Sequence, residues 1–386
     1  MILDDKFCMT KENLFFELIQ VAIGVRSCLS LTPNESEWED LYAMAMKQSL
    51  VGVCFAGIQR LGADADEGFA RIGMGEMLYL TWMGMTAKIQ QKNEVVNRLC
   101  VLLGERLKAE GYRYCILKGQ GVGLLYAEHL RGLRQSGDID VWIDGGVDAV
   151  VTLAESMGQK AEVTEQHVHL DVFEDTEVEA HFTPSMLRNP MADRRLQKLF
   201  KEQANACFEN KVCLMGGSMD GKEGKTICVP SVEFNLVYLL IHIYRHLFGE
   251  GVGLRQVMDY YFLLVNVNDR KLTVNYPLIL SRLGLLKFAG AVMYVLREVF
   301  GMERSLMLCE PNERHGKFLL NEIMIAGNMG HHDERLKETD RSTRWKRFWM
   351  MNKHNMRLIS YYPAETLWAP FTRVKIWAWR KRKGYL

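Results

Sequence analysis

The sequence has few of the features that mark unfolded or membrane-spanning chains. Only eight prolines occur among 386 residues, and no run approaches the ~20 apolar residues that cross a bilayer. The first residues, MILDDKF, also lack the apolar stretch of a secretory signal. We therefore expect a folded protein of the cytoplasm. Because 48% of its residues are hydrophobic, the chain can bury the cores of two or three domains.

Paired cysteine motifs are also missing. The nine cysteines are an odd number, none of them forms a C-x-x-C motif, and several lie in apolar runs such as LVGVCFAGI. This pattern argues against a disulfide framework and against a cysteine zinc site. We expect reduced cysteines that pack as small apolar residues in the core.

The hydrophobic pattern changes twice along the chain. Residues 1–92 repeat apolar residues at helical spacing, with Asn34 or Ser36 as a helix N-cap. Residues 93–230 combine helix patterns with short β-rich runs, and residues 231–386 return to apolar-faced helices. The sequence thus predicts an α+β fold with three regions. A small mixed-sheet core lies between an N-terminal helical region and a C-terminal helical region with a basic tail.

The middle region predicts the order helix, strand, helix, strand, helix, strand, strand. The run YRYCIL forms the first strand and DIDVWI the second. The runs QHVHLDVF and EVEAHF flank a turn at residues 174–176, so we expect them to pair as a hairpin.

Two carboxylates stand out at the strand DIDVWI. Because alternate side chains of a strand share a face, Ile139, Val141 and Ile143 can point into the core while Asp138 and Asp140 project from the other face. Carboxylates this close repel each other unless a cation lies between them. Magnesium prefers such oxygen ligands. The spacing therefore predicts a metal site for Mg²⁺ or Mn²⁺.

A third acid is expected on a neighbouring strand, and EVEAHF provides it. Glu177, Glu179 and His181 alternate with apolar residues, so both acids share one face of the strand. We favour Glu179, and Glu177 stays open because it lies two positions away on the same face. Three acids can hold two metal ions for an in-line attack on phosphorus. The ions also neutralise the charge that builds on the transferred phosphate.

The order of the motifs carries a family resemblance. The sequence has LKG before a short helix, then R-x-x-G-D-I-D, then an acid-x-His strand. Downstream, His242, His246, Arg255 and Asp259 lie in an apolar helical stretch. Over about residues 95–265 this order resembles the uncharacterised bacterial nucleotidyltransferase family, within the DNA polymerase beta-like nucleotidyltransferase superfamily.

The resemblance implies a reaction. A nucleoside monophosphate would pass from an NTP to an acceptor hydroxyl or phosphate, with release of pyrophosphate. Asp138, Asp140 and Glu179 would be the catalytic and metal-binding carboxylates, and Glu179 could instead help to deprotonate the acceptor. The acceptor is open: a small molecule, a sugar, a peptide or a protein fits equally well, and we do not expect nucleic acid. A non-catalytic descendant of the fold that binds nucleotide or a partner is the alternative.

The resemblance also implies how the NTP is held. Lys118 and Gly119 would lie against the triphosphate, in the place where the superfamily has a Gly-Ser doublet, and Arg134 would contact a phosphate. Arg255 and Asp259 are four residues apart on one helix, so we expect them to pair. Arg255 would then present a fixed guanidinium to a phosphate or an acidic acceptor, and a surface ion pair is the alternative.

Two other nucleotide-binding patterns are weaker. KGQGVG follows a strand and opens a helix, as in dinucleotide-binding folds, but Leu124 stands where the third glycine belongs. The run from Gly216 to Lys222 fits G-x-x-x-x-G-K, but Glu223 replaces the Ser or Thr that would reach magnesium. We interpret this glycine-rich run as a hairpin loop.

The histidines leave several alternatives open. His167 and His169 share a strand face and can bind metal or form hydrogen bonds within the sheet. His242 and His246, four residues apart on an apolar helix, can pack or line the substrate cleft. Residues 331–334, HHDE, are expected to form a solvated loop.

The C-terminal tail is strongly basic. From Arg341 onward there are twelve Lys and Arg against one acid, Glu365, a net charge of +11. Since the whole chain carries +1, the remainder carries −10. The tail is also rich in aromatic residues: Trp345, Phe348, Trp349, Trp368, Trp377 and Trp379. It can form a helical cap with its aromatics packed inward, or it can contact a membrane surface, nucleic acid or another acidic partner.

Overall fold

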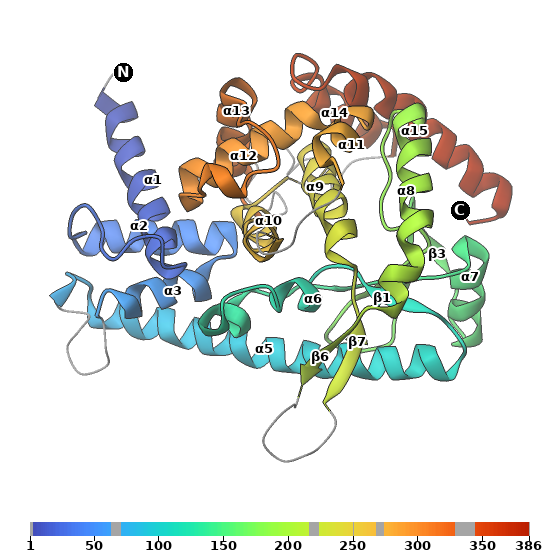
Figure 1. Ribbon diagram of the computed structural model, residues 1–386, viewed down its shortest axis with the longest axis horizontal. Helices are drawn as coiled ribbons and strands as arrows, with labels where there is room; N and C mark the ends of the chain where they lie inside the picture. Colours follow the sequence, from blue (N-terminus) through green and yellow to red (C-terminus); the bar gives the residue numbers. More distant parts are fainter. Residues whose placement is uncertain are drawn as a thin grey trace.

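Helices make up most of the chain, and one five-stranded sheet lies among them (Figure 1). The protein is known from a computed structural model. It describes residues 3–62, 71–215, 224–249, 251–267, 274–328 and 344–385.

The sheet is mixed, as predicted. Its strands are β1 (Tyr114–Ile116), β2 (Ile139–Ile143), β3 (Glu162–Val163), β4 (His167–Leu170) and β5 (Val178–His181). Their spatial order is β1-β2-β5-β4-β3, with β2 and β5 parallel and every other pair antiparallel. The predicted hairpin of β4 and β5 is therefore confirmed. Because β1 and β2 are antiparallel, the dinucleotide-binding alternative, which needs parallel strands, is wrong.

Helices flank the sheet at both ends of the chain, which confirms the predicted fold class. The first group is α1 (Leu3–Ala22), α2 (Glu35–Gln48), α3 (Val51–Arg60) and α5 (Glu76–Ala109). The sheet region adds α6 (Gln120–Gly123), a 3₁₀ segment (Glu128–Leu133), α7 (Gly146–Ser156), α8 (Pro190–Glu209) and the hairpin β6 (Lys211–Met215) and β7 (Lys225–Cys228). The second group is α9 (Val232–Phe248), α10 (Leu254–Val267), α11 (Tyr276–Arg282), α12 (Leu286–Phe300), the 3₁₀ segment Arg304–Leu306, α13 (Glu313–Ala326), α14 (Arg344–Met356) and α15 (Pro363–Lys383).

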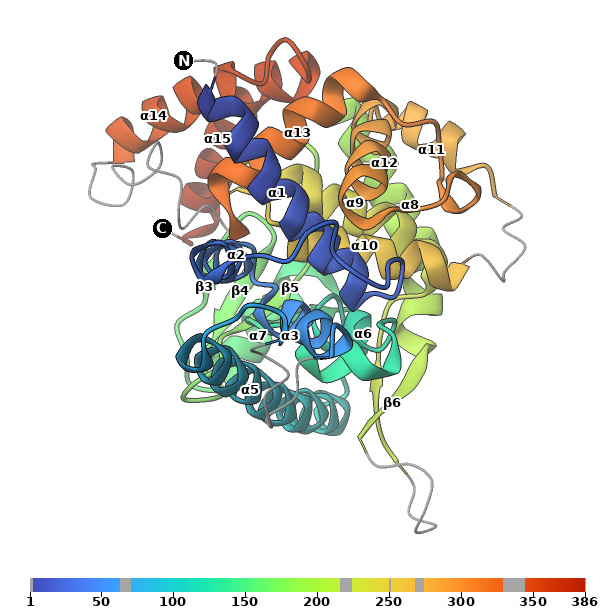
Figure 2. The ribbon, with the colours of Figure 1, turned by 90° about the vertical axis from the view of Figure 1, so that its left-hand side faces the viewer.

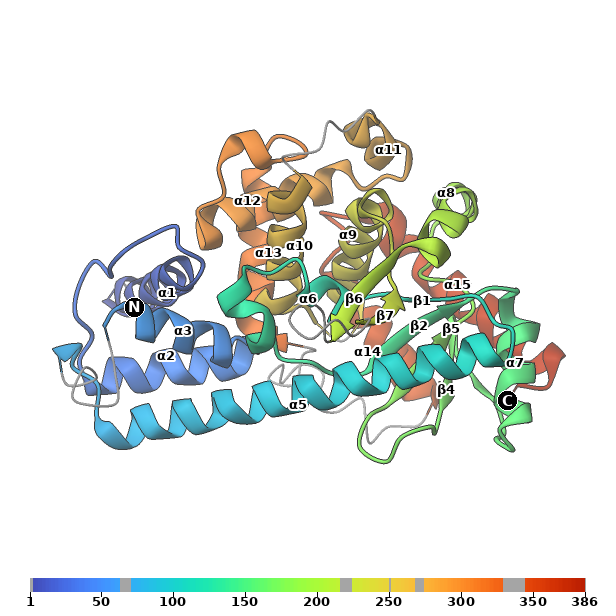
Figure 3. The ribbon, with the colours of Figure 1, turned by 60° about the horizontal axis from the view of Figure 1, so that its bottom comes forward.

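The longest helix, α5, joins the N-terminal helices to the sheet. It packs against α3 at one end and against β1 and the β6–β7 hairpin at the other (Figure 3). Since it runs through residue 92, the division of the chain at residues 92 and 230 stays a prediction. Asn34, of the two candidate caps, begins α2 through a capping box with Glu37. In Figure 2 the N-terminal helices face the viewer, and α1 packs against α12.

The two faces of the sheet belong to different cores. Ile139, Val141 and Ile143 of β2 are buried on one face, in a cluster with residues of α5 and α7. On the opposite face Trp142 packs against Phe208 and Phe234, whose ring centroids lie 4.6 and 5.7 Å away. The predicted alternation is thus confirmed. The face that carries the carboxylates is covered by helices instead of open to solvent.

Most of the described cysteine side chains lie in the core, as expected. Five of the eight are buried, whereas Cys28 and Cys213 are exposed. β6 and β7 pair antiparallel, as a hairpin loop requires, although Gly216–Lys222 and the histidine loop at 331–334 lie outside the described residues. Over the described ranges, no helix combines the length and the apolar character needed to cross a membrane.

One glycine sets the approach of α5 to the sheet. A Cβ at Gly104 would lie 2.0 Å from the hydroxyl oxygen of Tyr114, a buried residue of β1. Gly104→Ala should therefore lower the free energy of unfolding by about 1–3 kcal/mol, measured by urea denaturation. Gly84 lies on the same helix with no atom within 4 Å of such a Cβ. Gly84→Ala should raise the same quantity by about 0.5–1 kcal/mol, and shifts of equal sign would contradict this packing.

Candidate active site

The pairing of β2 with β5 brings two acids together. In their parallel register Asp140 is the partner of Glu179, and Trp142 is the partner of His181. Side chains at paired positions of neighbouring strands point to the same face. Asp140, Glu179 and His181 offer ligand atoms that all lie within 4.8 Å of one another. Glu177, the alternative third acid, is exposed and precedes the strand.

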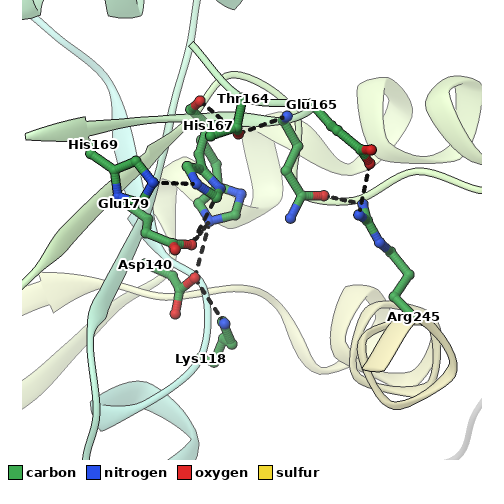
Figure 4. Close-up of polar contacts among 10 residues, drawn as sticks. Lys118, Asp140, Thr164, Glu165, His167, His169, Glu179 and Arg245 are labelled. Carbon is green, nitrogen blue, oxygen red and sulfur yellow. Dashed lines mark hydrogen bonds and ion pairs between the residues drawn. The ribbon is translucent and has the colours of Figure 1, made fainter. Parts of the chain in front are cut away.

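Positive and hydrogen-bonding groups surround this carboxylate pair (Figure 4). Lys118 Nζ lies 2.8 Å from Asp140 Oδ1. His181 Nε2 lies 3.0 Å from the same oxygen and 3.3 Å from Glu179 Oε2. Asp140 is 4% exposed and His181 2%. The side chain of His181 therefore bridges the two acids inside the protein.

The pKa values follow from these contacts. Burial opposes ionisation of Asp140, but Lys118 and His181 outweigh it and hold the pKa of Asp140 well below its usual range. Burial also raises the pKa of Glu179, yet the hydrogen bond from His181 and the charge of His167 leave that pKa lowered overall. Both carboxylates are therefore negative at neutral pH, as metal ligands must be.

Asp138 differs from Asp140 although it lies only two residues away. The charge of Asp140 and then burial raise the pKa of Asp138, and Lys118 only partly offsets them. The prediction that both acids face the same side holds, since Asp138 and Asp140 line one cavity. Asp140 is buried, however, and does not line the larger cavity beside it. Of the three acids, Asp138 and Glu179 line that larger cavity.

Two adjoining cavities meet at the carboxylates. The larger measures about 240 Å³ and the smaller about 40 Å³, and Lys118, Asp138, His242 and His246 line both. The smaller cavity is also lined by Gly119, Arg134, Gly137, Asp140, Arg255, Gln256 and Asp259. All seven site residues predicted from the sequence thus line one or both of these cavities.

The arginines are arranged differently from the prediction. Asp259 accepts hydrogen bonds from Arg134 at 2.7 and 2.8 Å and from the hydroxyl of Tyr126 at 2.8 Å. Arg255 donates to the carbonyl oxygen of Gln135 at 2.6 Å. The predicted ion pair of Arg255 with Asp259 is therefore wrong, because the buried Arg134 takes this carboxylate first. Among the described residues, the buried Nε of Arg255 has no hydrogen-bond partner.

The helix α9 contributes a polar stripe to the larger cavity. Tyr238, His242, Arg245 and His246 all line it, and they are spaced four, seven and eight residues from the first. The two histidines were candidates from their spacing in the sequence, whereas Tyr238 and Arg245 were not predicted. Their spacing on an otherwise apolar helix was the signal that could have found them. Of the two alternatives for His242 and His246, packing or lining the cleft, the structure shows that both line the cleft.

The strand β4 adds two histidines at the edge of the site. His167 Nε2 and His169 Nε2 are 3.3 Å apart, and His167 Nδ1 lies 3.3 Å from Glu179 Oε2. Beside them Arg245 contacts Gln166 and lies 3.2 Å from Glu165 Oε2 (Figure 4). His167 and His169 also offer ligand atoms within 4.8 Å of Glu179. Hydrogen bonding and metal binding therefore both stay open for this pair.

The donor atoms fit a divalent cation. Asp140 and Glu179 present ionised carboxylates at paired positions, and Asp138, which lines both cavities, adds a third carboxyl group. Carboxylate oxygens suit Mg²⁺, and an imidazole next to them is also compatible with Mn²⁺. The Nδ1 atom of His181 is buried without a hydrogen-bond partner among the described residues.

Comparison with known proteins identifies the family. The family model described as "Uncharacterised nucleotidyltransferase" matches residues 34–301, more than two thirds of the chain. The chain belongs to the uncharacterised nucleotidyltransferase family. No curated protein and no solved structure matches it.

Membership in this nucleotidyltransferase family agrees with the geometry. The matched region begins at the N-cap of α2 and ends after α12, so it contains both cavities and every predicted site residue. It extends well beyond the stretch of about residues 95–265 in which the sequence motifs lie. The match therefore includes the helices α2 to α12 as well as the sheet. α14 and α15 lie outside the match.

The two aspartates should respond oppositely to loss of charge. Asp138→Asn removes a carboxylate whose ionisation the fold disfavours, so stability at pH 7 should rise by up to about 1 kcal/mol. Asp140→Asn removes the negative charge that compensates Lys118 and stabilises the hydrogen bond to His181, so stability should fall by about 3 kcal/mol. Denaturation of both variants without divalent metal, in EDTA, measures the difference. Equal shifts would contradict the charge distribution described here.

Proposed function

We propose that the protein is a metal-dependent nucleotidyltransferase that moves a nucleoside monophosphate from an NTP to an acceptor and releases pyrophosphate. The observation that carries the proposal is the facing pair of ionised carboxylates, Asp140 and Glu179, on parallel strands, with Asp138 at the junction of two cavities. Membership in the nucleotidyltransferase family supports it.

The three carboxylates would hold Mg²⁺ or Mn²⁺. The ion would neutralise charge on the phosphate groups and orient them for an in-line displacement. Because its pKa is lowered, Glu179 stays ionised at neutral pH, which suits a ligand better than a general base. We therefore assign Glu179 to metal binding, and the sequence-based alternative of proton transfer is the weaker one.

The smaller cavity and the part of the larger one that adjoins it at Lys118 and Asp138 are the proposed place for the triphosphate. Lys118 brings an ammonium whose pKa stays raised because the neighbouring carboxylates outweigh burial. Arg255 contributes a guanidinium with an unsatisfied Nε, a donor that a phosphate oxygen can accept from. Gly119 has φ of +57°, a conformation that favours glycine and lets the chain turn directly after Lys118. Arg134 already makes a bidentate contact with the Asp259 carboxylate, so we assign it mainly to holding this wall.

The larger cavity is the proposed place for the acceptor. Gln166, Ser185, Tyr238 and Arg245 line it, together with His246. Burial and then the charge of Lys118 lower the pKa of His246 to about 3, so its ring is neutral at pH 7. A neutral imidazole has one N–H donor and one acceptor nitrogen. This polar lining suits a hydroxyl-bearing small molecule, a sugar, or a side chain of a peptide or protein. Since NTP and Mg²⁺ are supplied there, we infer the cytoplasm as the site of reaction.

The non-catalytic alternative gives a different picture of the same contacts. Lys118 already neutralises Asp140, so the site is charge-balanced to a large degree without a cation. A protein that only binds nucleotide or a partner would retain this arrangement and release no pyrophosphate.

Glu179 and Glu177 provide a matched test. Glu179→Gln should lower Mg²⁺-dependent pyrophosphate release by about a hundredfold or more, because it removes one of the carboxylate charges that would hold the metal ion. Glu177→Gln changes an exposed acid just before the same strand and should leave release unchanged. Release is measured from the four NTPs, with a small-molecule filtrate of cell extract as the source of acceptor.

A second readout separates the catalytic proposal from its alternative. Mn²⁺ binding, followed by electron paramagnetic resonance, should weaken in Glu179→Gln and persist in Glu177→Gln. Loss of release in the Glu177 variant, or full release in the Glu179 variant, would contradict the assignment. Metal binding without any pyrophosphate release would favour the non-catalytic descendant.

A further inference from the structure

The helix α15 turns large apolar side chains outward. Leu367, Phe371 and Val374, at positions i, i+4 and i+7, are 56%, 68% and 54% exposed. Trp368 and Trp377, on either side of them, are 43% and 50% exposed. These five residues form the apolar face of α15. A cap that packs its aromatics inward is therefore wrong for the two tryptophans. Exposed apolar faces of this kind mark binding surfaces.

The opposite face of α15 is polar and anchored. The carboxylate of Glu365, 6% exposed, accepts hydrogen bonds from the backbone N–H groups of Arg188 and Asn189 at 2.7 and 3.4 Å. Thr372 Oγ1 donates to the carbonyl oxygen of Arg188 at 2.8 Å. Specific polar contacts thus fix the rotation of the helix, since turning it would leave the buried Glu365 without partners. The apolar face points outward because the inward side is determined.

Basic side chains border the apolar face. Lys375, Lys381 and Arg382 are all exposed, and Lys381 Nζ lies 5.3 Å from the centre of the Trp377 ring. The last turn of α15 carries four basic residues in a row, Arg380–Lys383. A mixture of Trp, Phe and Leu with Lys and Arg around them is typical of helices that lie in the headgroup region of a bilayer.

The neighbouring helix repeats the pattern. α14 contacts α15, and on it Trp349 is 68% and Met356 53% exposed. Lys353, between them in sequence, is also exposed. In Figure 1 the two helices run along one border of the molecule, with the C-terminus of α15 beyond α8. Both lie outside residues 34–301, which the family model matches.

We propose that the apolar face of α15, with its basic border, binds an anionic membrane surface and holds the protein on it peripherally. Charge decides between a membrane and a second copy of the chain. The segment from Arg341 onward carries +11 and the rest of the chain −10, so an anionic surface attracts this side of the molecule and repels the others. A second copy of the chain would bring +11 against +11, which opposes self-association through this face. The proposal is independent of the nucleotidyltransferase activity.

Vesicle co-sedimentation of the full chain tests the proposal. The protein should bind vesicles of phosphatidylcholine with phosphatidylglycerol and remain in solution with phosphatidylcholine alone. Phe371→Ser with Trp377→Ser should abolish binding. Lys375→Gln with Lys381→Gln and Arg382→Gln should weaken it about fivefold for each charge removed. Because all five side chains are exposed, circular dichroism melting should show unchanged folding in both variants.

Two matched control variants remove exposed apolar or basic side chains from helices other than α15. Met77→Ser with Leu80→Ser changes two exposed apolar residues of α5, 77% and 44% exposed. Arg194→Gln with Lys198→Gln and Lys201→Gln removes three exposed charges from α8. Both control variants should bind like the unchanged protein.

Three results would overturn the proposal. They are no binding to anionic vesicles, equal loss of binding in the controls, and a dimer in sedimentation equilibrium that Phe371→Ser with Trp377→Ser converts to monomer. The last result would assign the apolar face of α15 to a second copy of the chain.

Discussion

The parallel register of β2 with β5 places two negative charges side by side in a covered part of the protein, and much of the site follows from this constraint. Asp140 and Glu179 are partners in the ladder, on the face that α8 and α9 cover. Carboxylates in this position are stable only with positive charge or hydrogen-bond donors around them. Lys118, at the turn after β1, and His181, two residues after Glu179, supply both. Asp138, at the junction of the cavities, has no such full compensation.

The surrounding helices give this charge arrangement a shape. α9 contributes an aromatic and basic stripe to the larger cavity, and α10 contributes Arg255 to the smaller. The buried contact of Arg134 with Asp259 links the loop before β2 to α10, so the wall beside Lys118 is held across 125 residues of sequence. The smaller cavity thus sets three cations, Lys118, Arg134 and Arg255, among its carboxylates. The larger cavity adds the uncharged polar groups of Gln166, Ser185 and Tyr238 to Lys118 and Arg245. Two adjoining polar cavities of different lining agree with the proposed transfer between two substrates.

Local alternation was enough to predict the carboxylate face. Apolar residues alternate with acids along this strand, Ile139 and Val141 with Asp138 and Asp140, and this alternation determines which face carries the acids. The LKG and GDID motifs pointed to the family. The sequence favoured Glu179 but left Glu177 open, because only the pairing with β2 determines which acid meets Asp140. It also placed Asp259 with Arg255, four residues away, when a buried guanidinium from a distant loop competes better for the same carboxylate. The exposure of the α15 aromatics could not be predicted from the sequence either. It depends on the hydrogen bond that Glu365 accepts from the backbone of Arg188.

The functional account rests on the claim that nucleotide binds at the carboxylate site. The most direct test is thermal unfolding in the presence of each of the four NTPs, with Mg²⁺ and with EDTA. At least one NTP should stabilise the protein only when Mg²⁺ is present, by about 2.7 kcal/mol at a concentration one hundred times its Kd. The same NTP should give little stabilisation of Asp138→Asn. Equal stabilisation in EDTA, equal stabilisation of the variant, or no stabilisation by any NTP would contradict the account.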